Sequence, residues 1–314
     1  MICIIYSIIL VFLTTCAFGQ AIMGPYWLYD NNYLTDKFVI NPAFAGNIYD
    51  PKVFVSTQRL DVVLRDAPTL HLAGGHGRLD FNPNQYGSVE SRSAMGGLVF
   101  ADNNGIYQSI GAKLDYAYYV PFNQKITILS FGLGGMLFSK RVRLDKYASI
   151  DDPLIAASMG NNVMIPDFNT GLFLSHKKLY VGFSVSQLLE NSYKFSDFNY
   201  TPARVFRNYY FLTGYRLEYS GFEFEPSIVA GYNFAPETKR NTGKFVDLNI
   251  ECFLKPVVVF RLSYRIDGYF NISLLYRTEE LELGIRTELV STNATDANFI
   301  GVCLMASYLI TINK

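Results

Sequence analysis

Hydrophobic and polar side chains alternate along most of the chain after residue 50. The alternation is clearest between residues 106 and 120, where Ile110 and Leu114 share one face and Lys113 and Asp115 share the other. A period of two positions indicates a β-strand with one face in apolar and one in polar surroundings. The run is longer than an ordinary globular strand, whereas a strand that crosses a membrane at a tilt needs about 9–11 residues. The pattern therefore predicts strands long enough to cross a membrane.

The same alternation recurs from one end of the chain to the other. It is strong in the segments 129–137, 179–185, 209–219, 222–234, 246–254, 258–266, 270–276 and 281–285, and weaker in 52–60, 69–79, 94–101, 168–175 and 299–310. Together with the segment 106–120, these segments predict about fourteen strands. An even number is what bacterial single-chain barrels have.

The connections between these strands are alternately short and long. Short turns are expected at 121–124, 176–178, 220–221, 255–256 and 278–280, and longer polar loops at 141–167, 189–206, 235–243 and 291–298. Short periplasmic turns and longer outer loops are typical of outer-membrane barrels. The connection 80–93 breaks this rule, because it should be short but is long and polar.

A soluble periplasmic β-sandwich is the alternative fold, because it would also bury one face of each strand. Strand length and loop asymmetry favour an all-β, transmembrane antiparallel barrel in the outer membrane, and so does the aromatic content of 16%, with 23 Tyr and 25 Phe. The mean hydropathy of +0.13 excludes a bundle of membrane-spanning helices. The chain has 27 basic and 27 acidic residues, and this neutrality argues against nucleic acid as a partner.

The N-terminus predicts export. Ile2–Leu13 is almost continuously apolar but too short to span a bilayer, and Ala17-Phe18-Gly19 offers small residues at a cleavage site. Residues 1–19 are therefore expected to be a signal peptide that is cleaved near Gly19/Gln20.

The mature chain is expected to have two parts. Residues 20–50 form a periplasmic N-terminal segment, and residues 51–314 form the barrel. Cys252 and Cys303 remain after signal cleavage, and two isolated thiols within strands make neither a disulfide framework nor a metal site.

Charged side chains within the strands fall on the polar face. A lipid-facing Arg or Lys near the midplane would cost about 2–4 kcal/mol, so a barrel turns these groups inward. The expected lumen-facing charges are Lys113, Asp115, Arg216, Glu218, Glu223, Glu225, Asp247, Glu251, Arg261, Arg265, Arg277, Glu282, Arg286 and Glu288. Their signs nearly cancel, whereas a selective pore usually carries a ring of one sign. Such a lumen suits either ion-pair networks that brace the wall or a polar guest.

Few residues offer chemistry. His71 and His76 are five positions apart on one predicted strand, so they lie on opposite faces and cannot share a metal ion. His176 falls in a turn flanked by lysines, and no Ser is placed to pair with a His as a nucleophile. The glycines of 132–135 lie within a strand, where they permit close packing rather than cradle a phosphate. The sequence predicts no catalytic residue, no cofactor and no metal, and hence a protein that is not an enzyme.

One motif stands just before the first strand. Asn41-Pro42-Ala43-Phe44-Ala45-Gly46 resembles the NPA[YF]AG hallmark of the PorP/SprF family, which belongs to the type IX secretion and gliding-motility apparatus of Bacteroidetes. Pro42 fixes φ and Gly46 permits a left-handed conformation, which predicts a compact turn. Further segments resemble family segments in order and spacing: Asp66–Thr69, Pro166–Leu172, Tyr180–Val185, Arg207–Tyr210, Thr213–Arg216 and Glu225–Ser227.

The resemblance covers essentially the whole mature chain. It implies a 14-stranded outer-membrane barrel that associates with periplasmic and lipoprotein components of the type IX apparatus. It also implies that the chain secretes or anchors a large adhesin-like protein through a C-terminal sorting domain, with Asn41–Gly46 as a partner-facing turn. Trp27–Asn31 and Tyr308–Lys314 depart from the family pattern. A porin or solute transporter remains the alternative.

Overall fold

The computed structural model describes residues 31–47, 51–64, 67–79, 92–105, 107–122, 126–142, 162–194, 203–219, 222–233, 244–254, 257–266, 268–291 and 298–310. The predicted signal peptide and residues 80–91 of the long connection lie outside this part of the chain. Among the described residues, no helix is both long enough and apolar enough to cross a membrane.

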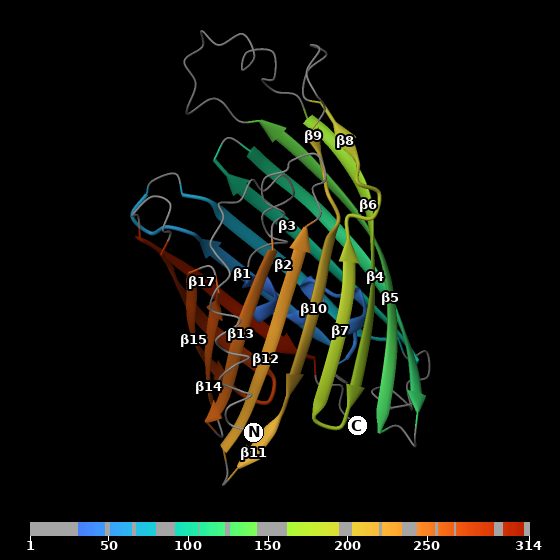
Figure 1. Ribbon diagram of the computed structural model, residues 1–314, viewed down its shortest axis with the longest axis vertical. Helices are drawn as coiled ribbons and strands as arrows, with labels where there is room; N and C mark the ends of the chain where they lie inside the picture. The colour runs from blue at the N-terminus through green and yellow to red at the C-terminus, as the bar shows by residue number, and fades with distance from the viewer. Residues whose placement is uncertain are drawn as a thin grey trace, which may run out of the picture.

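The wall is a closed antiparallel barrel of 14 strands (Figure 1). Its strands are β1 (Lys52–Arg59), β2 (Thr69–Arg78), β3 (Ser93–Asn104), β4 (Tyr107–Phe122), β5 (Thr127–Val142), β6 (Asn162–His176), β7 (Leu179–Ser186), β10 (Asn208–Tyr215), β11 (Leu217–Tyr219), β12 (Phe222–Asn233), β13 (Lys244–Leu254), β14 (Val258–Arg265), β15 (Tyr269–Arg277), β16 (Leu281–Ser291) and β17 (Asn298–Leu309). Because β10 and β11 both pair with β12, they act as one strand interrupted at Arg216. The pairings of β1 with β17 and of β10 with β12 close the ring, so every strand has two neighbours.

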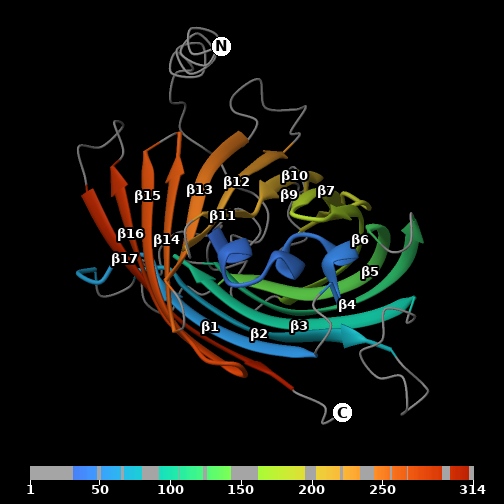
Figure 2. The same cartoon turned by 90° about the horizontal axis from the view of Figure 1, so that it is seen from below.

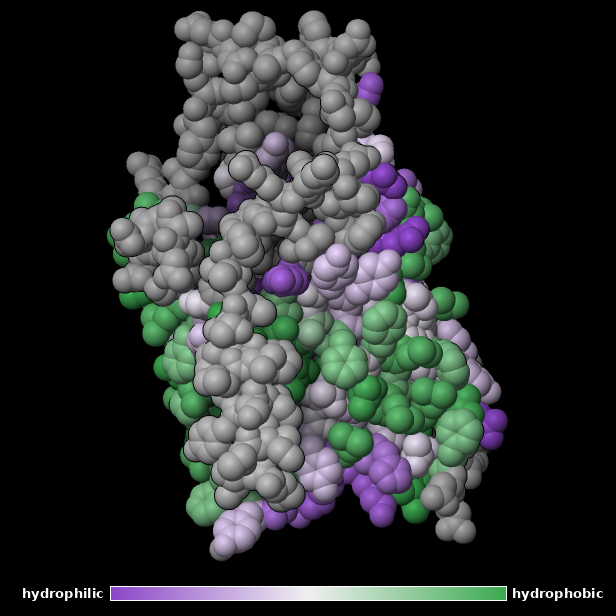
Figure 3. All heavy atoms as spheres, in the orientation of Figure 1, coloured by the Kyte–Doolittle hydropathy of each residue, from purple (hydrophilic) through white to green (hydrophobic). Residues whose placement is uncertain are grey.

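The alternation in the sequence corresponds to the two faces of this wall. On β4, Ile110 and Leu114 are exposed on the outside, whereas Lys113 and Asp115 are buried on the inside. Apolar side chains gather around the middle of the visible outer face, with hydrophilic ones above and below (Figure 3). The prediction of an all-β transmembrane barrel of about fourteen strands is therefore confirmed.

The two ends of the barrel differ, as the sequence predicted. One end, the short-turn end, carries the connections 123–126, 177–178, 220–221, 255–257 and 278–280. The other, the long-loop end, carries the connections 60–68, 143–161, 187–207, 234–243 and 292–297, and also two tight connections, 105–106 and 266–268, which depart from the expected asymmetry. The long connection between β2 and β3 lies at the short-turn end, where the backbone N–H of Leu79 donates to the carbonyl of Ser93 at 2.8 Å.

The lumen is not empty. Residues 31–47 form a compact body, here called the plug, which consists of the 3-10 helices η2 (Asn31–Leu34), η3 (Lys37–Val39) and η4 (Pro42–Phe44). The plug lies in the centre of the barrel and is surrounded by strands (Figure 2). The main hydrophobic core lies between the plug and the inner faces of β1–β7, β10, β12 and β13.

Candidate functional site

The family-like motif lies inside the barrel. Asn41 and Ala43 are completely buried, and η4 contacts β4, β5 and β6. From the sequence, Asn41–Gly46 is predicted to be a partner-facing turn of a periplasmic segment, 20–50. The structure places the motif, with the rest of 31–47, in contact with the inner wall.

The motif has the local geometry that its residue types favour. Asn41 caps η4, because its side-chain oxygen accepts a hydrogen bond of 2.9 Å from the backbone N–H of Ala43. Pro42 occupies the start of the helix, where its missing N–H costs nothing. Gly46 ends the plug with φ of +67°, a conformation that glycine adopts without strain. The predicted compact turn is therefore present.

Glycines in the wall make room for the motif. Gly132 on β5 and Gly171 on β6 are cross-strand neighbours, here called the glycine shelf. A Cβ atom on Gly132 would lie 2.2 Å from the backbone nitrogen of Ala43, and one on Gly171 would lie 2.2 Å from the side-chain oxygen of Asn41. Only residues without a side chain let the plug backbone approach the wall this closely. The expected role of residues 132–135 in close packing thus holds at Gly132.

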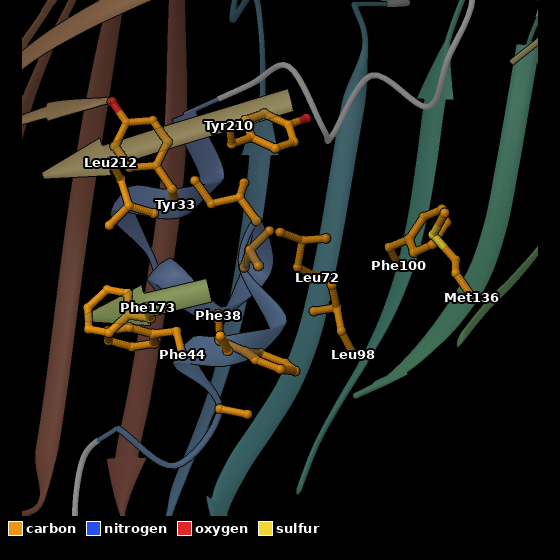
Figure 4. Close-up of a cluster of buried hydrophobic side chains, with 14 of the residues drawn as sticks. Tyr33, Phe38, Phe44, Leu72, Leu98, Phe100, Met136, Phe173, Tyr210 and Leu212 are labelled. Carbon is orange, nitrogen blue, oxygen red and sulfur yellow. The ribbon is translucent and has the colours of Figure 1, made fainter. Parts of the chain in front are cut away.

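Aromatic side chains of the plug pack on the apolar part of the wall (Figure 4). Phe44 meets the ring of Phe173 edge to face at 5.2 Å, and Phe38 is fully buried. A Cβ on Gly96 of β3 would lie 2.5 Å from the Phe38 ring, so a small residue is needed there as well.

The wall binds the plug mainly through its backbone carbonyls. Short 3-10 helices leave carbonyl oxygens without internal partners, and buried ones must find them elsewhere. Seven wall side chains, here called the carbonyl donors, supply these hydrogen bonds: Arg286 to Asn31, Arg261 to Leu34, Lys113 to Phe38 and Val39, Ser184 to Ile40, Ser130 to Ala43, Tyr119 to Ala45 and Arg78 to Gly46. Apart from that of Tyr119, these bonds measure 2.6–3.1 Å.

Asp36 anchors the plug to two side chains of the wall. Its carboxylate lies 2.9 Å from Nζ of Lys52 and 3.3 Å from Nε2 of His76, and it caps η3 through the N–H of Phe38. Burial by itself raises the pKa of Asp36, but the charge of Lys52 and the ring of His76 outweigh burial and hold that pKa below its ordinary value. The sequence alone predicts no role for His76, although its position on the inner face of β2 indicates that it is buried.

The predicted lumen-facing charges form a network that includes the plug. Arg265 makes a two-pronged contact of 2.6 and 2.8 Å with Asp247, and Tyr33 of the plug donates to the same carboxylate at 2.8 Å. Inner-wall pairs follow the same scheme: Lys113–Asp115, Arg216–Glu223, Arg216–Glu225, Arg261–Glu251, Arg277–Glu251, Arg277–Glu282 and Arg286–Glu288. Glu218 differs, because it pairs at 3.5 Å with Lys178 on the exposed short-turn end. The network thus braces the wall and also holds a polar guest, which is the chain's own segment.

A cavity of about 470 Å³, here called the vestibule, lies between the plug and the short-turn end. Its inner surface is the plug, including Lys37 and Asn47, and its rim includes Lys178 and Arg277. Lys37 reaches Glu225 on the wall at 3.1 Å. Side chains of both charges therefore line this cavity.

A hairpin of β8 (Ser192–Tyr193) and β9 (Ala203–Arg204) lies near the long-loop end (Figure 1). Tyr193 and Val205 are buried in the same hydrophobic core as the plug. The Lys140 ammonium lies 5.5 Å from the centre of the Tyr193 ring. The hairpin therefore packs into the barrel from the opposite end to the vestibule.

The remaining chemically notable side chains do not come together. His71 contacts Thr57 on the outer face at 2.5 Å, while His176 contacts Thr127 at 2.6 Å. Cys252 and Cys303 are not joined in a disulfide. Within the described part of the chain, no group of three or more His, Cys, Asp or Glu side chains could hold a metal ion.

Two solved structures with a similar fold are described as a transporter and a channel. The toluene transporter TodX of P. putida is 8% identical with a TM-score of 0.51, over 91% of this chain and 95% of TodX. The monoaromatic hydrocarbon channel CymD is 10% identical with a TM-score of 0.50, over 93% of this chain and 95% of CymD. At sequence identities this low, the structural similarity shows only that the folds are alike.

No curated protein sequence matches this chain significantly. A family model does, described as "Type IX secretion system membrane protein PorP/SprF", and it matches residues 25–308, nearly the whole chain. This match begins before the plug and ends in β17, so it includes every feature of the site described above. The chain therefore belongs to the PorP/SprF family of type IX secretion system membrane proteins.

Proposed function

We propose that this chain is a non-enzymatic outer-membrane component of the type IX secretion and gliding machinery that binds a large secreted, adhesin-like protein by its C-terminal domain and anchors or passes it. The observation that carries the proposal is the plug, whose carbonyls are held by seven wall side chains across the middle of the lumen. A barrel filled in this way suits the handling of a protein better than the free diffusion of solutes.

The vestibule supports a periplasmic approach of the partner. Short turns mark the periplasmic end of outer-membrane barrels, so the vestibule faces the periplasm, where lipoprotein components and exported proteins are found. Arg216 and Arg277 are 49% and 38% exposed at its rim, beside the acidic Glu223 and Glu282. Charges of both signs suit a protein surface, whereas an ion-selective mouth usually carries one sign.

Gentle extraction and co-isolation test the proposal. The tagged chain is expected to co-isolate with a large secreted protein, and an Arg216→Ala/Arg277→Ala double variant is expected to retain much less of it. Arg141→Ala is the matched control, because Arg141 is exposed at the long-loop end. Clean isolation of the unaltered chain without any secreted or periplasmic protein would contradict the proposal.

A solute channel is the other function that the fold allows, since TodX and CymD are described as hydrocarbon transporters. Conductance of the purified barrel across a planar bilayer separates the two functions. We expect the purified barrel to show no conductance. Signal cleavage near Gly19/Gln20 and the boundary at residue 50 also remain predictions, and sequencing the mature N-terminus tests the first.

A further inference from the structure

We propose that the inner wall around the plug is a polypeptide-binding site, and that a segment of the secreted partner takes the place of the plug there. The identity of the second occupant rests on the proposed function, whereas the existence of the site rests on contacts within this chain. The wall residues that contact the plug are here called the seat.

The seat binds the backbone of the segment that occupies it. Its carbonyl donors bind eight backbone oxygens spread from Asn31 to Gly46, an arrangement that any polypeptide of similar path could satisfy. The donors are themselves buried: Arg286 and Ser184 are 0% exposed and Lys113 is 4% exposed. Leaving such donors without partners is costly. The plug is therefore best released when another chain offers carbonyl oxygens in exchange.

The seat also has hydrogen-bonding capacity that the plug does not use. On the inner face of β15, both polar atoms of the Asn271 amide and the hydroxyl of Ser273 have no hydrogen-bond partner among the described residues. Both side chains are 1% exposed. Ser273 is the cross-strand neighbour of Arg261 on one side and of Arg286 on the other, and both of these are carbonyl donors.

Native proteins seldom leave buried amides unpaired, so such groups call for an explanation. Asn271 and Ser273, here called the β15 strip, extend the row of carbonyl donors along the wall. A polypeptide that follows this row more closely than the plug does would use them.

The geometry also limits the sequence of the incoming segment. The glycine shelf accepts a segment with a small residue at the Ala43 position, because a Cβ on Gly132 would collide with the backbone at Pro42 and Ala43, and Ala43 is completely buried. Apolar side chains suit the places of Phe38 and Phe44. We therefore expect a segment of about the plug's length, with an Asn-Pro-Ala-like turn between two apolar residues.

The vestibule provides the route of exchange. Asn47 at the end of the plug and Lys52 at the start of β1 both line the vestibule. The plug is thus connected to the wall on the side from which the partner is expected to approach.

The first experiment uses the full chain with a protease site inserted between Asn47 and Lys52, which is cut after folding in detergent. The probe is a fluorescent synthetic peptide of residues 31–47. We expect saturable binding to the cut chain and binding about 100-fold weaker to the uncut chain, where the tethered plug competes at high effective concentration. The same peptide carrying Ala43→Leu is expected to bind about tenfold more weakly, because Ala43 is completely buried and a larger side chain overpacks its site.

Two outcomes would overturn the inference. One is a cut chain that keeps its original plug and exchanges none of it for the probe over many hours. The other is equal binding of the normal and the Ala43→Leu peptides, which would place the probe somewhere other than the seat.

The second experiment follows the tethered plug when the partner binds. In a Cys252→Ala/Cys303→Ala background, Ala43→Cys is treated with a charged maleimide, and Lys178→Cys on the exposed turn serves as the control. We expect the thiol at position 43 to react several-fold faster in chains that carry the co-isolated partner than in chains stripped of it. An unchanged rate with partner bound overturns the inference and leaves the proposed function standing, whereas absence of any partner overturns the proposed function.

Discussion

The imidazole of His76 in the wall connects two distant points of the plug, because its Nε2 lies 3.3 Å from Asp36 while its Nδ1 accepts a hydrogen bond of 3.0 Å from the N–H of Gly46. An imidazole that accepts at Nδ1 and donates from Nε2 satisfies both contacts as one neutral tautomer. The ring also packs against Phe38 at 5.1 Å and Phe44 at 6.0 Å between centroids. His76 therefore fixes η3 and the end of the motif with one side chain.

Replacing this ring tests the connection. His76→Phe keeps an aromatic ring beside Phe38 and Phe44 but removes both hydrogen bonds and leaves Asp36 with Lys52 alone. We expect the free energy of unfolding in urea to fall by about 1.5–3 kcal/mol, the usual cost of losing hydrogen bonds to a buried charged group. His71→Phe is the matched control, since His71 is on the outer face of the same strand. Equal losses in both variants would show that the contact with the plug contributes nothing.

The close contact between the glycine shelf and the plug predicts that a larger residue in the shelf displaces the plug. A second glycine on the same strand provides the control. Gly132→Ala places a methyl group 2.2 Å from the backbone of Ala43, so the plug has to move away from β5. We expect a loss of about 1–3 kcal/mol in unfolding free energy, as for other overpacked sites, together with measurable ion conductance in planar bilayers. Gly135→Ala on the same strand is the control, because its methyl group meets nothing closer than 3.9 Å. A Gly132→Ala barrel that conducts no ions and keeps its full free energy of unfolding would contradict the close approach of the plug to β5.

The wall could be predicted from the sequence because membrane and lumen impose opposite preferences on successive residues. Each of the fourteen expected strand segments coincides with a wall strand, and the weak segment 168–175 proves to be the end of the longer β6, Asn162–His176. Pro166 and Asp167 at its start are poor strand formers, so residues 162–167 are predicted as part of the loop 141–167, which is shorter in the structure.

The plug could not be predicted in the same way. Residues 31–47 have no period of two, and their burial depends on wall residues far along the chain, such as Gly132 and Arg286. The resemblance identified the motif Asn41–Gly46, and its residue types predicted a turn. Neither observation indicates where in the molecule that turn lies. Alternation predicts only that the charges within the strands face inward, and it gives no indication that Arg261 and Arg286 bind backbone carbonyls.

The Asp247–Arg265 pair predicts a large loss when it is broken. Asp247 is completely buried and receives two hydrogen bonds from Arg265 and one from Tyr33. Asp247→Ala leaves the guanidinium buried without its partner, which typically costs about 3–5 kcal/mol. Lys178→Ala, which removes the exposed pair with Glu218, is the control and should cost about 0–1 kcal/mol. Urea unfolding of the two variants measures the difference, and similar small losses would mean that the buried network does not brace the barrel.

Substitutions in the β15 strip distinguish binding of the plug from binding of a partner. Asn271→Leu/Ser273→Ala replaces polar groups that have no partner in the described structure with apolar groups of similar size, so the free energy of unfolding should stay unchanged or rise. Because the plug does not use these groups, the protection of a thiol at Ala43→Cys from maleimide should not change. Retention of the secreted partner in co-isolation should nevertheless fall several-fold. Ser184→Ala is the contrasting variant: it removes the hydrogen bond of 2.7 Å to the carbonyl of Ile40, so it should expose the plug thiol and lower stability by about 0.5–1.5 kcal/mol. If the double variant retains the partner in full, the strip takes no part in partner binding.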